Sequence, residues 1–79
     1  MEQLENLLAV LARSLVDEPD RVEVSGMETD SRVDLELRVA PDDMGRVIGR
    51  QGRTIRAIRT VVKAASVKQG KRVSVEVPD

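Results

Sequence analysis

Two glycines separated by two polar residues constrain the fold of this chain more than any other feature. They lie at the centre of the segment Val47-Ile48-Gly49-Arg50-Gln51-Gly52-Arg53-Thr54-Ile55. Glycine has no Cβ, so a loop with glycine at both corners can turn sharply and can let another backbone come close. Residues with helical spacing flank this loop on both sides. The sequence therefore predicts two helices joined by a short, sharply turned loop.

The end of this loop is a predicted anion site. If the chain is helical from Ile55 onward, the amides of the first turn lie just past Gly52 and have no partners inside the helix. The helix dipole adds partial positive charge there, and arginines surround the loop. Helix N-termini of this kind bind phosphate groups, and we favour the backbone of single-stranded RNA as the ligand. Taken alone, the two glycines are more simply explained as an ordinary turn.

Hydrophobic periodicity predicts six elements along the chain. We expect helices over roughly residues 2–16, 42–48 and 53–68, and strands over residues 21–24, 33–39 and 73–77, with a polar turn over residues 26–31. The predicted core face of the first helix carries Leu4, Leu7, Leu8, Leu11 and Leu15. That of the third helix carries Ile55, Ile58, Val62 and Ala65.

The order of these elements is α-β-β-α-α-β, which predicts an α+β fold. The first two strands read as an antiparallel hairpin. The last strand follows a helical crossover, so it should lie parallel to the 33–39 strand. We expect one mixed three-stranded sheet with helices on one face, and a single domain over residues 1–79.

Charge is distributed unevenly along the chain. Residues 1–43 hold twelve acids and four bases, whereas residues 44–79 hold nine bases and two acids. No acid occurs between Met44 and Val75. A basic region of this kind is typical of nucleic-acid binding even when the whole chain is acidic. Attraction between the two halves, or to another subunit, is the alternative explanation.

Several residue types are absent, and their absence excludes some functions. The chain has no aromatic residue, so it lacks the stacking platform of an RNA-recognition-motif sheet. It has no histidine and no cysteine, which leaves few groups for acid–base or nucleophilic catalysis and none for disulfides. No apolar run approaches a membrane span. We therefore expect a cytoplasmic, non-catalytic protein without a membrane segment.

Two other motifs have weaker claims to a function. The spacing of Gly45, Gly49 and Gly52 fits neither a Walker loop nor a dinucleotide fingerprint. Asp42 and Asp43 are adjacent acids after a proline, which we interpret as capping and dipole partners of a helix start and not as metal ligands. No metal, cofactor or small-molecule substrate is expected.

The glycine loop resembles the signature of KH domains, Ile-Gly-x-x-Gly with apolar residues on both sides. The α-β-β-α-α-β order is similar to the type II arrangement of that family, and the resemblance covers the whole chain. In length the chain resembles small bacterial proteins that consist of one KH domain. The resemblance implies a type II KH fold in which the loop clamps the backbone of about four nucleotides.

The resemblance also implies which residues bind RNA. Gly49, Arg50, Gln51 and Gly52 match the clamping loop, and Ile48 and Ile55 match apolar positions beside the nucleotide groove. The expected RNA-binding set is Arg46, Ile48, Gly49, Arg50, Gln51, Gly52, Arg53, Ile55 and Arg56. Two alternatives remain open, because the two isoleucines could be plain core residues and the arginines after the loop could be a solvated helix face.

Expected partners follow from the same resemblance. Small KH proteins of this kind are linked to RNA regulation that affects cell shape and division, and to a larger RNA-binding partner that contains a KH domain. We expect single-stranded RNA as ligand, an RNA chaperone or post-transcriptional regulatory role, and a homodimer or a complex with such a partner. The predicted contact is the helix around Thr60 to Lys68, where Val61 and Val67 fall outside the core stripe. The alternative function is a dimerisation adaptor with a KH fold.

Overall fold

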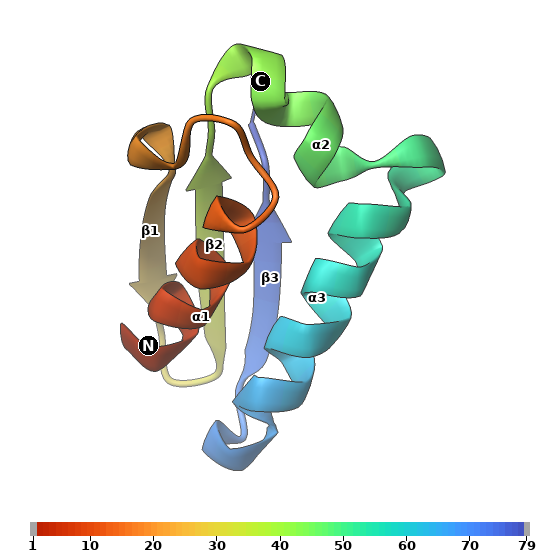
Figure 1. Cartoon of the computed structure of the whole chain (residues 1–79). Coiled ribbons are helices and arrows are strands. Elements are labelled where there is room, and N and C mark those ends of the chain that lie inside the picture. Colours follow the sequence, from red (N-terminus) through yellow and green to blue (C-terminus); the bar gives the residue numbers. More distant parts are fainter. Residues whose placement is uncertain (1, 79) are drawn as a thin grey trace.

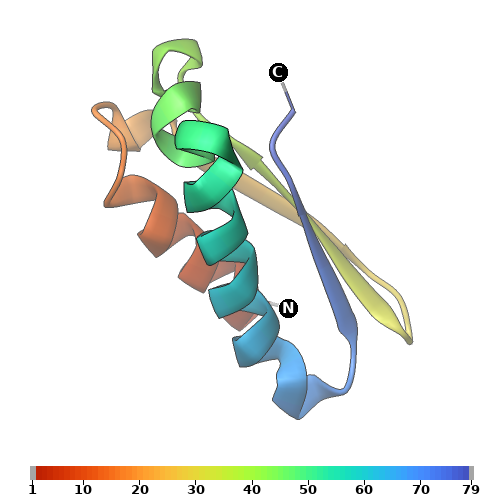
Figure 2. The ribbon, with the colours of Figure 1, turned by 90° about the vertical axis from the view of Figure 1, so that its right-hand side faces the viewer.

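The computed structural model describes residues 2–78, which form a layer of helices against one face of a three-stranded sheet (Figures 1 and 2). The helices are α1 (Glu2–Arg13), α2 (Met44–Ile48) and α3 (Arg53–Ser66), and the strands are β1 (Glu23–Glu28), β2 (Arg32–Arg38) and β3 (Arg72–Glu76). Four short 3-10 turns connect them: η1 (Pro19–Arg21), η2 (Pro41–Asp43), η3 (Arg50–Gly52) and η4 (Val67–Gln69). The predicted α+β fold and its element order are confirmed.

The sheet has the predicted mixed topology, with strand order β1-β2-β3. β1 pairs with β2 in the antiparallel sense, and β3 pairs with β2 in the parallel sense. The predicted turn over residues 26–31 is wrong in its first half, because Gly26, Met27 and Glu28 pair with β2. Glycine is a poor strand former in isolation, but cross-strand pairing outweighs its local preference here.

The core lies between the sheet and helices α1 and α3. Its buried apolar side chains are Leu4, Leu8, Ala12, Val22, Val33, Leu35, Leu37, Val47, Ile55, Ile58, Val62, Val73 and Val75. β2 contributes alternate residues, as the strict alternation of its sequence predicts. Two helical predictions need correction. Ser66 is buried where Ala65 was expected, because it continues the four-residue spacing from Val62, and Leu15 lies beyond the end of α1.

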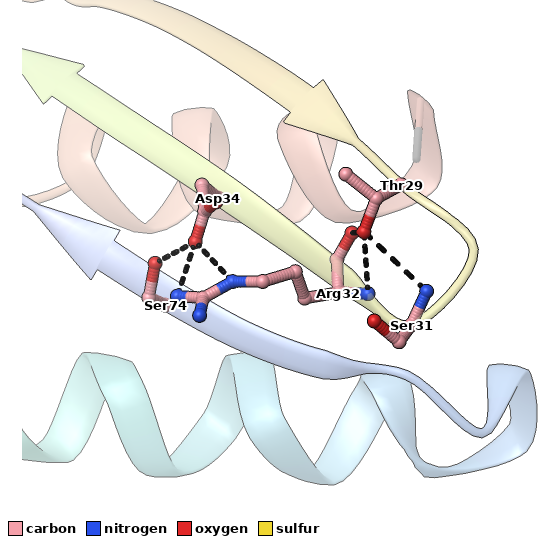
Figure 3. A network of polar contacts seen from close by, with 5 residues as sticks. All are labelled: Thr29, Ser31, Arg32, Asp34 and Ser74. Atoms are coloured by element: carbon pink, nitrogen blue, oxygen red, sulfur yellow. Dashed lines mark hydrogen bonds and ion pairs between the residues drawn. The ribbon is translucent and has the colours of Figure 1, made fainter.

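The opposite face of the sheet carries mainly polar side chains, with Met27 exposed among them, and is covered by no helix within residues 2–78 (Figure 3). On it, Asp34 accepts hydrogen bonds from the Ser74 hydroxyl at 2.6 Å and from the Arg32 guanidinium at 2.8 Å. These bonds lower the pKa of Asp34, and the bond from Ser74 has the largest effect. Thr29 closes the β1–β2 turn by accepting the Arg32 amide at 3.1 Å. Polar bonds thus hold this face, while the helices bury the other.

An ion pair also links the last residue of β1 to the residue before β3, near the start of β2. Lys71 donates a hydrogen bond to Glu28, which lowers the pKa of that carboxyl. Separately, none of the helices in residues 2–78 has both the length and the apolar character needed to cross a bilayer.

Candidate nucleic-acid interface

The predicted loop lies at the junction of α2 and α3, on the edge of the helical layer (Figure 1). α2 ends at Ile48, and the next four residues turn the chain before α3 begins at Arg53. Gly49, Gln51 and Gly52 all have positive φ, at 76°, 58° and 74°. Such angles are rare for residues other than glycine. The loop therefore holds one strained residue, Gln51, between two glycines that adopt the conformation freely.

Glycine is also required at position 49 because the backbone there lies close to the start of α3. A Cβ added at this position would lie 2.7 Å from the Thr54 Cβ and 2.8 Å from the Thr54 amide nitrogen. A Cβ added at Gly52 would meet only the Ile55 side chain, at 4.0 Å. The two corners of the loop therefore differ, since Gly49 needs both its dihedral angles and its small size, and Gly52 needs only its angles.

Backbone hydrogen bonds close the loop tightly. The Gly49 amide donates to the Gly45 carbonyl at 2.8 Å, and the Gly52 amide donates to the Gly49 carbonyl at 3.2 Å. The Arg53 amide donates to the Arg50 carbonyl. Within residues 2–78 no side chain caps the start of α3. The first amides of a helix generally have no acceptor within the helix, so an N-terminus without a side-chain cap can receive an anion.

Arg56 braces this loop from the first turn of α3. Its Nε donates to the Gly52 carbonyl at 3.3 Å, and a terminal nitrogen donates to the Gln51 carbonyl at 3.0 Å. Arg56 was predicted to contact RNA, and the structure places its guanidinium on the loop's own carbonyl groups. It therefore holds the strained Gln51 conformation in place.

Arg46, on the other side of the loop, is neutralised by two acids. Its guanidinium pairs with Asp17 at 3.0 Å and with Asp43 at 3.7 Å. Asp43 is only 2% exposed and also accepts the backbone amides of Asp17 and Glu18, both at 3.1 Å. The prediction that Asp43 caps a helix is therefore wrong, because no side-chain cap forms at η2 or α2 among the described residues. It instead ties the segment after α1 to the start of α2.

The two isoleucines beside the loop differ in exposure. Ile55 is buried at 4% and belongs to the core cluster. Ile48 is half-buried and packs against the edge of that core. Of the two, Ile48 therefore presents more apolar surface to a ligand at the loop.

The basic side chains from the loop onward along α3 form no ion pair with any acid in residues 2–78. These residues are Arg50, Arg53, Arg56, Arg59 and Lys63. Arg50 and Arg53 are exposed, and Arg59 is half-buried with its Nε donating to the Val75 carbonyl at 3.1 Å. The sequence pattern placed Arg59 only on a basic helix face. It did not predict the contact with β3, because local periodicity does not indicate contacts with a distant strand.

The arrangement of loop, helices and mixed sheet agrees with the outcome of sequence comparison. The sequence model of the family "KhpA/KhpB, KH domain" matches residues 5–77. The chain belongs to this family. It is 57% identical over 74 residues to the RNA-binding protein KhpA of Clostridium acetobutylicum, an alignment that covers 94% of this chain and 99% of the relative. It is 46% identical over 78 residues to the RNA-binding protein KhpA of Bacillus subtilis, covering 99% of this chain and 96% of the relative.

Solved structures with the same fold include two of the protein Era. One is Era in complex with MgGDPNP and nucleotides 1506–1542 of 16S ribosomal RNA, with a TM-score of 0.70 and 17% sequence identity. The match covers 94% of this chain and 28% of the Era chain. The other is Aquifex aeolicus Era, also with a TM-score of 0.70 and 17% identity, over 95% of this chain and 29% of that chain. At this identity the likeness concerns the fold alone.

Proposed function

We propose that this chain is a non-catalytic RNA-binding protein that clamps single-stranded RNA on the Gly49–Gly52 loop. The observation that carries the proposal is the start of α3, which no side chain of residues 2–78 caps and beside which Arg50 and Arg53 lack acidic partners. Helix dipole, free amides and unpaired arginines all favour a phosphate group at one place. On this proposal residues 1–79 act as one KH domain.

Family membership supports the proposal. The relatives from Clostridium acetobutylicum and Bacillus subtilis bear the name RNA-binding protein, and both align over almost their full length. The absence of aromatic residues implies that bases pack on aliphatic surface, of which Ile48 is the nearest to the loop. We infer an RNA chaperone or post-transcriptional regulator that works in the cytoplasm.

The proposed RNA-binding residues have distinct roles. Arg50 and Arg53 would contact phosphates directly, because both are exposed beside the loop and neither pairs with an acid within residues 2–78. Arg56 would act by holding the loop, through its bonds to the Gln51 and Gly52 carbonyls. Arg46 would contribute less, because Asp17 and Asp43 already neutralise it.

A double substitution in the loop tests this proposal. Arg50→Asp with Gln51→Asp should abolish binding of unpaired RNA, because two carboxylates would face the phosphate at the helix N-terminus. The fold should persist, since both side chains are exposed and aspartate tolerates positive φ. The matched control is Gln3→Asp with Arg13→Asp, which makes the same charge change at exposed positions of α1.

Gel-shift affinity and circular dichroism are measured for both variants. The control should bind as the unaltered protein does, and equal binding by the loop variant with a native spectrum would disprove the clamp.

The salt dependence of binding supplies a second readout on the unaltered protein. Each phosphate contact to a single strand contributes about −0.7 to the log–log slope, so roughly three or four contacts predict a slope near −2 to −3. A slope near zero would exclude the basic half as the binding surface.

One such site buries little RNA, so its affinity should be weak and a second site should strengthen it. We propose that the second site comes from a homodimer, or from a larger partner that contains a KH domain. Two exposed valines after Thr60 support this, Val61 on α3 at 44% exposed and Val67 in η4 at 75% exposed. Apolar side chains left outside the core favour contact of this segment with another protein surface.

A further inference from the structure

β1 forms one end of the sheet, and its outer edge is free (Figure 1). Within residues 2–78, β2 is the one strand that pairs with β1. The Thr29 amide donates toward β2, to the Arg32 carbonyl at 2.9 Å. Because the direction of main-chain groups alternates along a strand, every second residue of β1 directs its amide and carbonyl away from β2. These residues are Val24, Gly26 and Glu28.

This free edge lacks the features that commonly block the addition of another strand. Such features are lysine or proline side chains, bulges and very short strands. β1 has six residues without lysine or proline, and it pairs with β2 one-to-one from Glu23 to Glu28, which leaves no bulge. Gly26 lies in the middle of the edge and has no side chain to hinder an approaching backbone. The edge can therefore accept a further strand.

Charge indicates which kind of strand this edge accepts. Residues 17–30, which contain β1 and the connections on both sides of it, hold six acids and one base. Glu23 on β1 is exposed and pairs with no base in residues 2–78. Two β1 edges brought together would place like charges side by side, which disfavours a second copy of this chain. Phosphate groups are disfavoured for the same reason, so a basic peptide is the fitting partner.

The two faces of β1 predict the pattern of that peptide. Glu23 and Met27 lie on the open face of the sheet, because each pairs with a β2 residue that alternates with the buried ones. Met27 is 74% exposed. A lysine of an added strand on this face can place its ammonium at Glu23 and its methylene stem over Met27. On the other face Val24 packs against the core, so an apolar residue fits beside it.

We propose that the outer edge of β1 is a docking site for an extended segment of another protein in which basic and apolar residues alternate. The segment adds to the sheet as a fourth strand, through the main-chain groups of Val24, Gly26 and Glu28. This edge lies on the opposite side of the molecule from the Gly49–Gly52 loop (Figure 1). The inference does not depend on the proposed RNA binding.

The first test uses a short, fluorescently labelled peptide of alternating lysine and valine, and fluorescence anisotropy with the unaltered protein. Two further peptides carry methyl groups on the amide nitrogens of either the valines or the lysines. All three have the same charge, but only one edge of the peptide faces β1. One methylated peptide should therefore bind roughly tenfold or more weakly, and the other should bind as the parent does. Equal binding of all three would overturn the proposal, because charge alone would then explain it.

A charge reversal on the protein tests the place of binding. Glu23→Lys should weaken binding of the lysine–valine peptide roughly fivefold or more, because it puts a like charge beside the docked strand. Glu76→Lys is the matched control, since Glu76 is also exposed and pairs with no base in residues 2–78 but lies on β3. Circular dichroism checks that both variants fold. Equal losses for the two variants would overturn the proposal.

Amide hydrogen exchange then locates the peptide on the unaltered protein. The Gly26 amide should exchange rapidly in the free protein and slowly when the lysine–valine peptide is bound. The amides of Ser25 and Met27 face β2, so the peptide should change their exchange little. Binding without new protection at Gly26 would overturn the proposal, and so would a failure of the parent peptide to bind.

Discussion

Gly49 and Gly52 form a pair in sequence but have different roles at the scale of single residues. Gly49 has φ of 76° and ψ of 170°, a region that is essentially restricted to glycine, and its Cα lies against Thr54. Gly52 is left-handed, with φ of 74° and ψ of 16°, and it has space for a side chain. Size therefore matters at the first glycine, and backbone conformation matters at both.

Alanine at the two positions should separate these roles. We expect Gly52→Ala to cost about 1 kcal/mol, the penalty of the left-handed conformation. Gly49→Ala should cost more than about 2 kcal/mol, because the Thr54 backbone would have to shift as well. Urea unfolding measures both free energies. Equal losses for the two variants would contradict the close contact between Gly49 and Thr54.

At the scale of elements, Asp43 connects parts of the chain that are distant in sequence. Its carboxylate accepts the amides of Asp17 and Glu18, after α1, and pairs with Arg46 on α2. These bonds hold the segment that follows α1, which ends at Arg13, against the start of α2, the helix that leads into the loop. The position of α2 depends on this buried carboxylate.

The neighbouring acids provide a matched test of that role. Asp43→Ala leaves two backbone amides and one arginine without their partner, so it should destabilise the fold by roughly 2–4 kcal/mol. Asp42→Ala removes an exposed acid from the same turn and should change stability by less than about 0.5 kcal/mol. Urea midpoints of the two variants should therefore differ clearly. Similar midpoints would show that the Asp43 bonds contribute little.

The polar contacts of the sheet predict how stability depends on pH. Lys71 lowers the pKa of Glu28, and Ser74 with Arg32 lowers that of Asp34. A carboxyl whose folded pKa is lowered stabilises the fold above its unfolded pKa and loses that effect as pH falls through the folded pKa. A variant with Lys71→Met and Ser74→Ala should be less stable at neutral pH. Its deficit should narrow between about pH 5 and pH 3 in thermal unfolding, whereas a deficit independent of pH would argue against these bonds as the cause.

At the scale of the whole molecule, charge and exposed apolar surface determine how copies of the chain can meet. α3 carries Arg53, Arg56, Arg59 and Lys63 and no acid. Contact between two α3 helices would therefore bring like charges together around the exposed Val61. Contact between the acidic first half and the basic second half would bring opposite charges together. Added salt distinguishes these two contacts. Screening of like charges strengthens a contact between two α3 helices, and screening of opposite charges weakens a contact between the acidic and basic halves.

We predict a homodimer through α3 at micromolar concentration, strengthened by added salt. Val61→Lys should abolish it, because another cation would enter a contact that already brings like charges together. Val10→Lys is the control, since Val10 is 62% exposed on α1 and lies outside the proposed contact. Sedimentation equilibrium measures the mass. A species of 8.7 kDa alone, at concentrations up to about 100 μM, would exclude the homodimer.

The sequence by itself determined the element order, the parallel and antiparallel pairing and the place of the loop. These follow from local patterns: the alternation of Val33, Leu35 and Leu37, the helical spacing of Ile55, Ile58 and Val62, and glycines where a helix must break. Such patterns have a direct physical cause, because side chains on one face alternate along a strand and recur every three or four residues along a helix. They also placed the RNA-binding prediction on the loop.

Only the tertiary structure decided which groups meet across the fold. Gly26 to Glu28 join β1 because β2 lies beside them, although their sequence reads as a turn. Asp43 is buried and Asp42 is exposed, and only the position of the Asp17 and Glu18 amides distinguishes them. Arg56 donates a hydrogen bond to the loop and Arg59 donates one to the Val75 carbonyl, although both belong to one basic stripe. Each outcome depends on a partner distant along the chain or on the bent path of the backbone, which local periodicity does not encode.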